Sequence, residues 1–435
     1  MVDFDEAFEK TYELGRYQIF MVILLCIPTC FQNSYGDLSW VFLFYTPEHA
    51  CYVSPELRAN YTAQGYDLKV GQCEITLTRN ASTGPAVETT SYPCREGWIY
   101  DDSVFTNTLI TRWNLVCDRA IYANTVLSLS GVATMVGCIM MSWIQDKYGR
   151  KITFEICVVI YCAGSISSLF MTDLVMFAVV RFVGDLTAIS SWNVGYIWAM
   201  EVVGPSKRTL ISTILCVVYA LAGVSLAGWG YLCNNWMAFG LTTSVPFIAQ
   251  LAFHCLLVES PRWLLSRGRV GEALKAFKTI VKRNGGHISD EQLKRLACGT
   301  KDAKRLEAEN EAGETANILD LFRGYQLRCK TVLITGVWVA NALVYITIAF
   351  NVENIGGSFF AMFALQAFME APAVLINLAI LNKVGRIFPL VVAMVIDGIC
   401  CLLTAVSGVP IWLTMTFALV GKFGICCSYI IIFQV

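Results

Sequence analysis

Ten long apolar runs limit what this chain can fold into. Each has roughly the twenty residues that a helix needs to cross a hydrocarbon core of about 30 Å. The runs lie at 17–37, 121–144, 152–171, 174–198, 209–230, 237–258, 331–350, 359–381, 388–407 and 411–434. Because a backbone in lipid must satisfy its own hydrogen bonds, the pattern predicts an all-α polytopic membrane protein.

The composition fits a protein that lies in a lipid bilayer. Of the 435 residues, 56% are hydrophobic and 15% are charged, which is too few charges for a soluble surface of this size. The formal net charge of -1 argues against nucleic acid as a partner. Acidic residues occupy the place of a positively charged signal-peptide region, so we expect the first apolar run to act as its own insertion signal.

Basic residues in the short loops predict the orientation. Alternate loops carry Lys147, Arg150 and Lys151, then Lys207 and Arg208, then Lys383 and Arg386. The loops near 172, 233, 354 and 409 carry neither Lys nor Arg. Since basic loops stay in the cytoplasm, we expect an integral membrane protein, at the plasma membrane, with a cytoplasmic N-terminus.

These assignments divide the chain into five segments. They are 1–41, with the N-terminal tail and first helix; 42–119, a large glycosylated extracellular loop; 120–258, with helices 2–6; 259–330, a cytoplasmic loop; and 331–435, with helices 7–10.

The two long loops carry different signals. The outer loop holds glycosylation sequons at Asn60 and Asn80 and four cysteines, which allow three disulfide pairings: Cys51, Cys73, Cys94 and Cys117. This loop is either a stapled folding cap or a surface that captures substrate or partners. In the inner loop, Glu272–Arg283 and Ser289–Glu311 predict short amphipathic helices, with a charge-rich linker as the alternative.

A repeated loop indicates two homologous halves. Asp146-Lys147-Tyr148-Gly149-Arg150-Lys151 recurs as Asn382-Lys383-Val384-Gly385-Arg386, each time between two apolar runs on the predicted cytoplasmic side. In the first half, three apolar runs follow the helix that comes directly after the repeated loop. In the second half, only one run follows the corresponding helix. If the two halves are symmetric, the full set has twelve helices and this sequence contains ten of them.

The repeated loops resemble the Gly-x-x-x-Asp-Arg/Lys-x-Gly-Arg-Arg/Lys signature of the major facilitator superfamily, although Ser142 replaces the leading Gly. Two further runs, 113–117 (WNLVC) and 259–265 (ESPRWLL), are similar to those of solute carrier family 22, the organic cation and anion transporters. The resemblance implies the major facilitator fold. Members of this family continue with an Ala-Glu-x-x-Pro-Thr segment and two more helices, which this sequence lacks.

Charged residues inside the apolar runs are candidates for transport, because a charge in a membrane span is costly and faces a cavity or a partner. They are Glu155, Arg181, Asp185, Glu370, Asp397 and Lys422. Arg181 and Asp185 are four residues apart on one helical face, so they form either a structural pair or part of a cavity lining.

Glu370 is the leading candidate for binding substrate. It lies two residues before Pro372, with no basic residue within a helical turn or two, which predicts a counter-ion for a cation or a protonation site. A hydrogen bond that supports the fold is the alternative. Organic-anion members carry Lys two places after this proline, where this chain has Val374, so the resemblance favours cations or zwitterions. Lys422 resembles a basic residue of the family and is expected to pair with Asp397 or Glu370.

Aromatic rings can hold an organic cation. Trp192, Tyr196, Trp198, Trp338 and Tyr345 lie in the fourth and seventh spans, which line the central cavity in this superfamily. Packing against lipid or other helices is the alternative for each ring.

The repeated loops are expected to control conformational switching rather than binding. Gly149 permits a tight turn, and Asp146 is expected to cap the third helix. Arg150 and Lys151 are expected to engage carboxylates or helix C-termini of the opposite half in one state of the transport cycle. Anchoring by positive charge is the alternative. The repeated loops add Lys147, Gly385 and Arg386 as gating candidates. Glu201 and Arg208 flank an inner loop and Arg262 begins the inner domain, so they are candidates for gating ion pairs.

No enzyme, metal or cofactor site is predicted, since His49, His254 and His287 are scattered and no glycine-rich phosphate loop is present. The leading hypothesis is a facilitative or exchange carrier for small organic cations or zwitterions that works by alternating access. The alternatives are an organic anion exchanger, a non-transporting short form that regulates or binds, and a receptor that uses the glycosylated loop.

Overall fold

The computed structural model describes residues 14–79, 88–288, 322, 324–406 and 409–434. Within these residues, ten helical segments are long and apolar enough to cross a membrane. They are Arg16–Leu43, Cys117–Tyr148, Arg150–Ser168, Leu174–Val202, Pro205–Leu232, Trp236–Phe253, Tyr325–Phe350, Phe359–Leu381, Ile387–Thr404 and Ile411–Ile432. The predicted helical membrane region is therefore confirmed.

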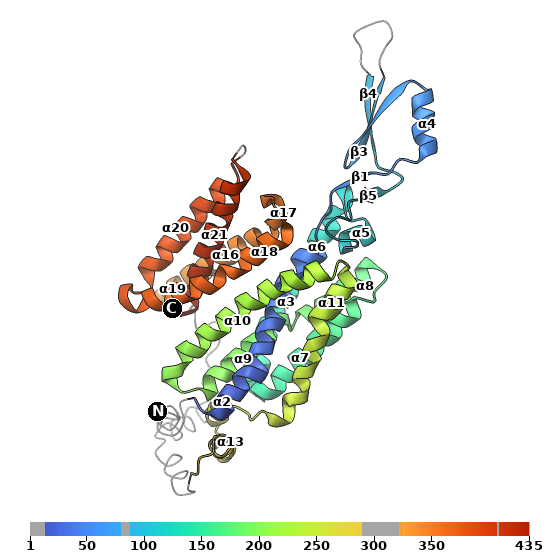
Figure 1. Cartoon of the computed structure of the whole chain (residues 1–435). Helices are drawn as coiled ribbons and strands as arrows, with labels where there is room; N and C mark the ends of the chain where they lie inside the picture. Colours follow the sequence, from blue (N-terminus) through green and yellow to red (C-terminus); the bar gives the residue numbers. More distant parts are fainter. Residues whose placement is uncertain (1–13, 80–87, 289–321, 323, 407–408, 435) are drawn as a thin grey trace.

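The first six spans form one group of packed helices (Figure 1). Their elements are α2 (Arg16–Met21), the π-helix η1 (Val22–Cys26), α3 (Ile27–Leu43), η2 (Cys117–Arg119), α6 (Ala120–Tyr148), α7 (Arg150–Ser168), α8 (Leu174–Asp185), α9 (Ala188–Val202), α10 (Pro205–Leu232), α11 (Trp236–Ser244) and η3 (Val245–Leu256). We call this group the first half. The π-helix lies just before Pro28, which has no backbone N–H to continue the regular pattern.

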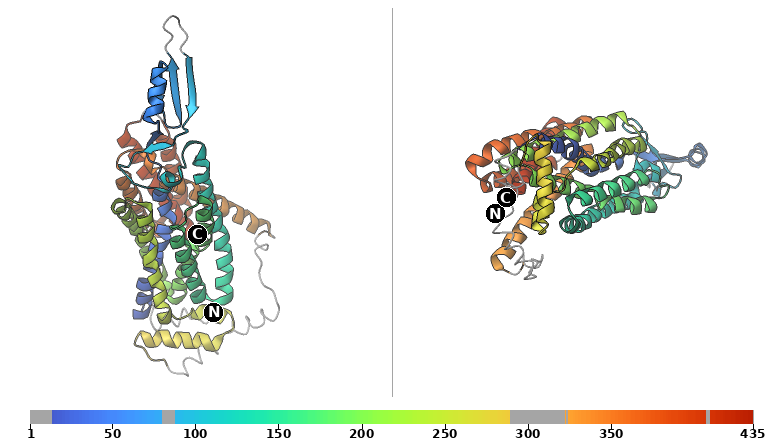
Figure 2. Two further views of the ribbon diagram at one scale, coloured as in Figure 1. Left: turned by 90° about the vertical axis from the view of Figure 1, so that its right-hand side faces the viewer. Right: turned by 90° about the horizontal axis from the view of Figure 1, so that it is seen from below.

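The last four spans form a second group beside it, which we call the second half (Figures 1 and 2). Its elements are α16 (Tyr325–Phe350), α17 (Val352–Ile355), α18 (Phe359–Phe368), α19 (Glu370–Val384), α20 (Ile387–Thr404) and α21 (Ile411–Gln434). The two groups meet mainly through α10, which packs against α18 and α19.

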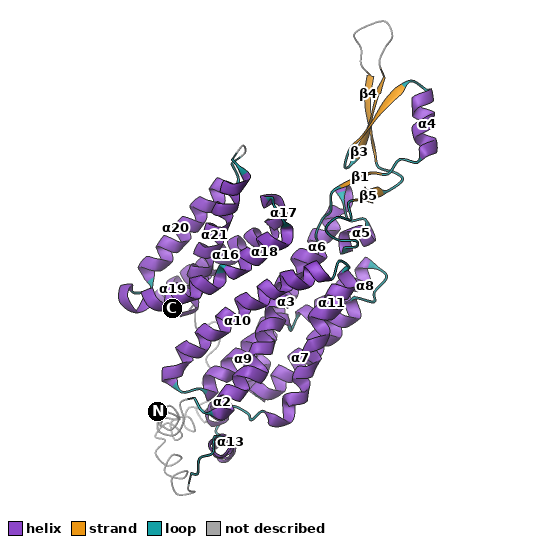
Figure 3. Ribbon diagram, in the orientation of Figure 1, coloured by secondary structure: helices purple, strands orange, loops and turns teal. Residues whose placement is uncertain are grey.

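Strands occur only in the long loop between α3 and α6, within the described residues (Figure 3). Strands β1 (His49–Cys51) and β5 (Trp98–Tyr100) pair antiparallel, and β2 (Tyr66–Val70), β3 (Glu74–Arg79) and β4 (Glu88–Pro93) form a meander beside α4 (Pro55–Ala63). The end of the molecule that carries these strands is called the sheet end below.

Disulfides select one of the three predicted pairings in this loop. Cys51 pairs with Cys94, and Cys73 pairs with Cys117, with Cα–Cα distances of 5.3 and 5.6 Å. Asn60 lies exposed on α4, so it is accessible for glycosylation, whereas Asn80 lies outside the described residues.

The opposite end carries α12 (Pro261–Ser266) and α13 (Val270–Arg283), and is called the α13 end (Figure 2). The predicted amphipathic helix over 272–283 is confirmed as α13, which buries Ala273, Phe277 and Ile280 on one face. Asn284 joins α13 to the first span, because its side chain accepts from the Tyr17 backbone N–H at 2.8 Å. The second predicted helix, 289–311, lies outside the described residues.

Two spans are interrupted near the middle, and an acidic residue lies at each interruption. Helix α8 ends at Asp185 and α9 begins at Ala188, while α18 ends at Phe368 and α19 begins at Glu370. Pro372 loosens the second interruption as predicted, since the bond from the Ala373 N–H to the Met369 carbonyl is 3.4 Å long. Interrupted helices at membrane depth are typical of transporter binding sites.

Candidate functional site

Arg181 and Asp185 form the predicted ion pair in the first half. The Arg181 Nε atom lies 3.1 Å from Asp185 Oδ1, and both side chains are buried. Ser130 of α6 donates to Asp185 Oδ2 at 2.6 Å, and the Arg181 guanidinium lies 4.6 Å from the centre of the Trp40 ring. The pair is thus a structural junction of α3, α6 and α8, with the Arg181 charge further stabilised by an aromatic face.

Glu370 is not unpaired, and this part of the prediction was wrong. Its Oε1 atom lies 3.0 Å from Lys422 Nζ on α21 and accepts a hydrogen bond of 2.7 Å from the Tyr345 hydroxyl on α16. Lys422 is distant from Glu370 in the sequence, so a search within one or two helical turns misses it. Of the two partners proposed for Lys422, the ion pair forms with Glu370, while Asp397 accepts from Cys401 at 3.6 Å.

Aromatic side chains surround this second-half pair. The Lys422 Nζ atom lies 3.4 Å from the centre of the Tyr345 ring. Tyr429, which the sequence did not single out, lies 6.0 Å from Tyr345 and 5.2 Å from Trp338 between ring centres. The structure therefore brings Tyr345, Trp338, Glu370 and Lys422 together in the second half.

The aromatic candidates on α9 form a separate group. The rings of Trp192 and Tyr196 lie 5.4 Å apart, and the Tyr196 hydroxyl bonds to Ser212 of α10 at 3.1 Å. Trp198 is fully buried against Phe154, which assigns it to the core of the first half. Trp192 and Tyr196 remain candidates for the lining of the central cavity.

Asp37 is a charged residue that the sequence prediction missed. It lies in α3, beyond the middle of that helix, beside Tyr219 of α10. Tyr219 in turn lies beside Tyr345 of α16, so these three side chains cross the boundary between the halves. Asp37 is the last residue of the run 17–37, which suggests a place at the edge of the membrane, but the helix continues to Leu43 and puts Asp37 inside the span.

Aromatic rings join the two halves at the sheet end. Phe42 of α3 is nearly fully buried and makes ring contacts with Phe105 and Phe239 on its own side of the boundary and with Phe359, Phe360 and Phe363 of the second half. Its ring centre lies 4.6 Å from that of Phe363. We call these six rings the aromatic plug, because they hold the two halves together on the sheet-end side of the buried charges.

The first repeated loop forms a network within one half. Gly149, at φ 111°, makes the turn between α6 and α7, and a Cβ there would clash with the Glu259 carboxylate. The Arg150 Nη2 atom lies 2.8 Å from Glu201 Oε1, and Nη1 lies 3.2 Å from Asp146 Oδ1. The expectation that Arg150 engages the opposite half does not hold in this conformation, because its partners belong to α6 and α9.

Glu259 caps α7, a role that the sequence analysis assigned to Asp146. Its carboxylate accepts from the backbone N–H groups of Arg150 at 3.1 Å and Lys151 at 3.2 Å, where the positive end of the helix dipole favours an anion. Asp146 instead offers its backbone carbonyl to Trp263 Nε1 at 2.8 Å, while Lys151 donates to the Leu257 carbonyl at 3.2 Å. The family-like run around Glu259 therefore binds the loop to α12.

The remaining gating candidates lie on α6, α12 and the second repeated loop. Lys147 is exposed, with Nζ 4.7 Å from the centre of the Trp143 ring, and Arg262 is half-buried in α12. In the second copy, Gly385 makes an equivalent turn at φ 82°, but Arg386 is exposed. The second loop thus lacks the ion-pair network of the first within the described residues.

The Glu259 cap predicts a pH effect on stability. Burial raises the pKa of Glu259 above its ordinary value of 4.5, against the opposing effect of its N–H donors and Arg150. At pH values just above 4.5, the folded state therefore binds more protons at Glu259 than the unfolded state does. The contribution of Glu259 to the free energy of unfolding falls as the pH rises through this range. We expect Glu259→Gln to lose less thermal stability than the wild type between about pH 5 and about pH 7.

Thermal unfolding in detergent at both pH values checks this effect. Glu272→Gln is a matched control, since Glu272 is exposed and, among the described residues, pairs with Arg269 of the same surface helix region. A difference between wild type and Glu259→Gln that stays constant with pH would contradict the assignment.

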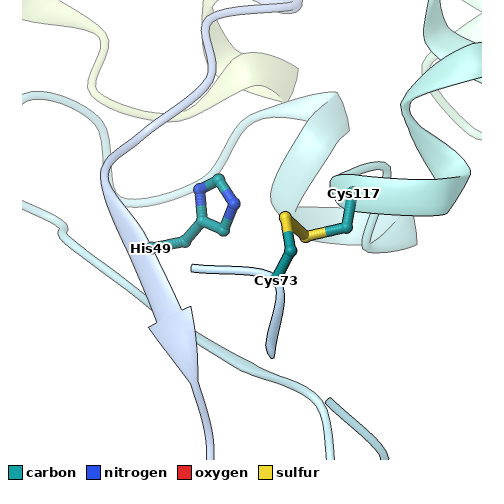
Figure 4. A group of neighbouring side chains, drawn as sticks. All are labelled: His49, Cys73 and Cys117. Atoms are coloured by element: carbon teal, nitrogen blue, oxygen red, sulfur yellow. A yellow bond between two sulfur atoms is a disulfide. The ribbon is translucent and has the colours of Figure 1, made fainter. Parts of the chain in front are cut away.

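His49, Cys73 and Cys117 are close enough together to suggest a metal site (Figure 4). The two sulfur atoms are bonded to each other, so neither is a thiolate that could ligate a metal ion. His49 Nδ1 lies 3.1 Å from the Pro47 carbonyl. The group is therefore a structural feature at the base of the loop.

Comparison with known proteins identifies the family. The family model described as "Sugar (and other) transporter" matches residues 62–435. The chain belongs to this transporter family. The predicted membership of the major facilitator superfamily is thus confirmed, and the transporter is an integral membrane protein.

The transporter is similar to several curated membrane transporters. The beta-alanine transporter of Drosophila melanogaster is 28% identical, over 99% of this chain and 76% of that protein. Organic cation transporter 1 of Caenorhabditis elegans is 27% identical, over 99% and 75%. Solute carrier family 22 member 3 of Rattus norvegicus is 25% identical, over 100% and 82%. The predicted resemblance to solute carrier family 22 is confirmed.

Solved structures share the fold. The partially occluded inward open conformation of the xylose transporter XylE from E. coli has a TM-score of 0.59 and 12% sequence identity, and the match covers 96% of this chain and 87% of that one. At this identity the likeness establishes the fold alone.

Proposed function

We propose that the transporter moves small organic cations, or zwitterions with a cationic group, across the membrane by alternating access. The observation that carries this proposal is the charge balance of the buried side chains in the spans. Within the described residues and away from the ends of the spans, these are the carboxylates Asp185, Glu370 and Asp397 and the cations Arg181 and Lys422. Arg150 is also buried, but it is the first residue of its span and pairs with Glu201 and Asp146. Half-buried Asp37 adds a further carboxylate. An interior with excess negative charge favours a cationic solute.

The organic anion alternative has less support. An anion carrier would need unpaired basic groups, but Arg181 and Lys422 are both in ion pairs, and Val374 is a buried apolar residue. The similar proteins include organic cation transporters, a carcinine transporter and a beta-alanine transporter. These names agree with cations and zwitterions as the substrate class.

Alternating access fits the arrangement of the two halves. In the described part of the chain, the second-half residues of the shared hydrophobic core come from the sheet end: Ala349, Val352, Ile355, Phe359, Met362, Phe363 and Ala418. A separate core lies within the second half, including Ala373, Ala393 and Ile425. Two units joined at one end can rock about their boundary.

The cysteine bridges and the lysine residues at the two ends of the molecule support an orientation in the membrane. Disulfides and exposed Asn60 lie at the sheet end, whereas Lys147, Lys151 and Lys383 lie at the other end of their helices. Cystines belong to oxidising compartments and basic loops to the cytoplasm. We therefore place the sheet end outside the cell, the N-terminus inside, and the transporter in the plasma membrane.

Uptake measurements test the function. Cells that express the full chain should take up labelled tetraethylammonium and labelled β-alanine saturably and faster than control cells, and should discriminate against a labelled aromatic carboxylate. Surface biotinylation controls for delivery to the membrane. Uptake no faster than in control cells despite normal delivery would contradict the proposal, and preference for the carboxylate would favour an anion exchanger.

A further inference from the structure

Asp37 lies where groups from several helices meet. Its helix is buried on both sides of it, at Gly36 and Leu38. The titratable groups near it come from four other helices: Tyr219 of α10 forms a hydrogen bond with Asp37, and Cys138 of α6, Asp185 of α8 and Tyr429 of α21 are close enough to interact with it electrostatically. This set contains no Lys, Arg or His. Asp37 is therefore surrounded by neutral or acidic groups from both halves.

The other acidic residues buried in the spans have cations beside them. Asp185 pairs with Arg181 at 3.1 Å and Glu370 with Lys422 at 3.0 Å, and Asp397 interacts electrostatically with Lys422. Asp37 has Tyr219 as a hydrogen-bond partner but makes no ion pair in the described part of the chain, which leaves one carboxylate without a cation beside it. Since a shielded carboxylate without a counter-ion is costly, a cation that arrives from outside the protein would bind here favourably.

Tyrosine rings lie beside this carboxylate. Tyr219 lies between Asp37 and Tyr345, and Tyr429 interacts with both Asp37 and Tyr345. Rings of this group already hold one cation, because Lys422 Nζ lies over the Tyr345 ring. A carboxylate with aromatic faces beside it is the combination that recognises a substituted ammonium group.

We propose that Asp37 binds the positively charged nitrogen of the transported ion, and that Tyr219 and Tyr429 contact its alkyl groups. This inference rests on the proposed transport of organic cations and names the residue that selects for charge. Lys422 already neutralises Glu370, so Glu370 positions Tyr345 and the second half rather than receiving the substrate directly. A cation at Asp37 would touch groups of both halves, as alternating access requires.

Charge selectivity is the readout that distinguishes this role from a structural one. Choline and its neutral isostere 3,3-dimethyl-1-butanol are compared as inhibitors of labelled tetraethylammonium uptake. We expect the wild type to prefer choline, and Asp37→Asn to lose about tenfold or more of that preference, as for loss of a hydrogen bond to a charged group. Asp37→Glu, which keeps the charge, should retain a preference.

Asp173→Asn is the matched control, because it makes the same change at an exposed carboxylate that caps its own helix, where Asp173 accepts from the backbone N–H groups of Val175 and Met176. It should keep the wild-type preference for choline. If Asp37→Asn does not fold, Asp37→Thr provides a second neutral variant.

Two failures can be told apart. If the wild type takes up tetraethylammonium and Asp37→Asn still prefers choline by the wild-type ratio, the assignment of Asp37 is wrong while the proposed function stands. If the wild type neither takes up the cation nor prefers choline, the proposed function itself is overturned.

Discussion

Replacing Lys422 with Gln should destabilise the transporter by about 3–5 kcal/mol and abolish uptake, since it leaves the Glu370 carboxylate buried without a cation. Lys422 is 2% exposed and Glu370 is 8% exposed, so water cannot compensate for the lost partner. Tyr345 alone would remain as a donor to Glu370. The free energy of unfolding in detergent and uptake in cells are the measurements.

The double variant Glu370→Gln/Lys422→Gln is the control for this pair. It removes both charges and should recover most of the lost stability, because two neutral amides can bond to each other. If the double variant is as unstable as the sum of the two single variants, the ion pair is not the cause. Recovery of stability without recovery of uptake would show that the pair also supports transport.

Replacing Phe42 with Ala should cost about 3–5 kcal/mol, because it removes a ring at the centre of the aromatic plug and leaves a cavity. The loss should fall on the contact between halves, since three of the five ring partners of Phe42 belong to the second half. The transporter should therefore lose thermal stability and also change its transport rate, because the closed state at the sheet end becomes less favourable.

Phe44→Ala is the matched control on the same helix. Phe44 is also buried, but its ring contact is with Trp40, its neighbour on the helix. This variant should lower stability with little effect on the transport rate of the protein that reaches the membrane. Equal effects of both variants on the rate would argue against a gating role for the plug.

The spans could be predicted because each carries its own signal. Length and hydropathy decide whether a helix can cross lipid, and both are local properties of the chain. The Arg181–Asp185 pair was also predictable, since residues four apart share a helical face. The same rule fails for Glu370 and Lys422, which lie on different helices, so their meeting depends on how α19 packs against α21.

The features that the sequence analysis missed are those set by tertiary packing. Choosing one of three disulfide pairings requires knowing which strands pair, and the strands are short and mostly polar. Glu259 becomes the cap of α7 only because η3 returns the chain to the start of that helix. Asp37 was missed for a simpler reason, because it is the last residue of the run 17–37 and suggests the edge of the span, whereas the helix continues to Leu43.

The disulfides of the long loop fix the strands to the first half of the transporter. Cys51 follows α3 closely and Cys117 begins the helix pair η2–α6, so both bridges attach the strands to helices of the first half. The Thr106 N–H and the Asn234 carbonyl, 3.0 Å apart, add another attachment to that half. An antibody fragment bound to the exposed strands would therefore travel with the first half, and distances from it to labels on α20 would report the rocking motion directly.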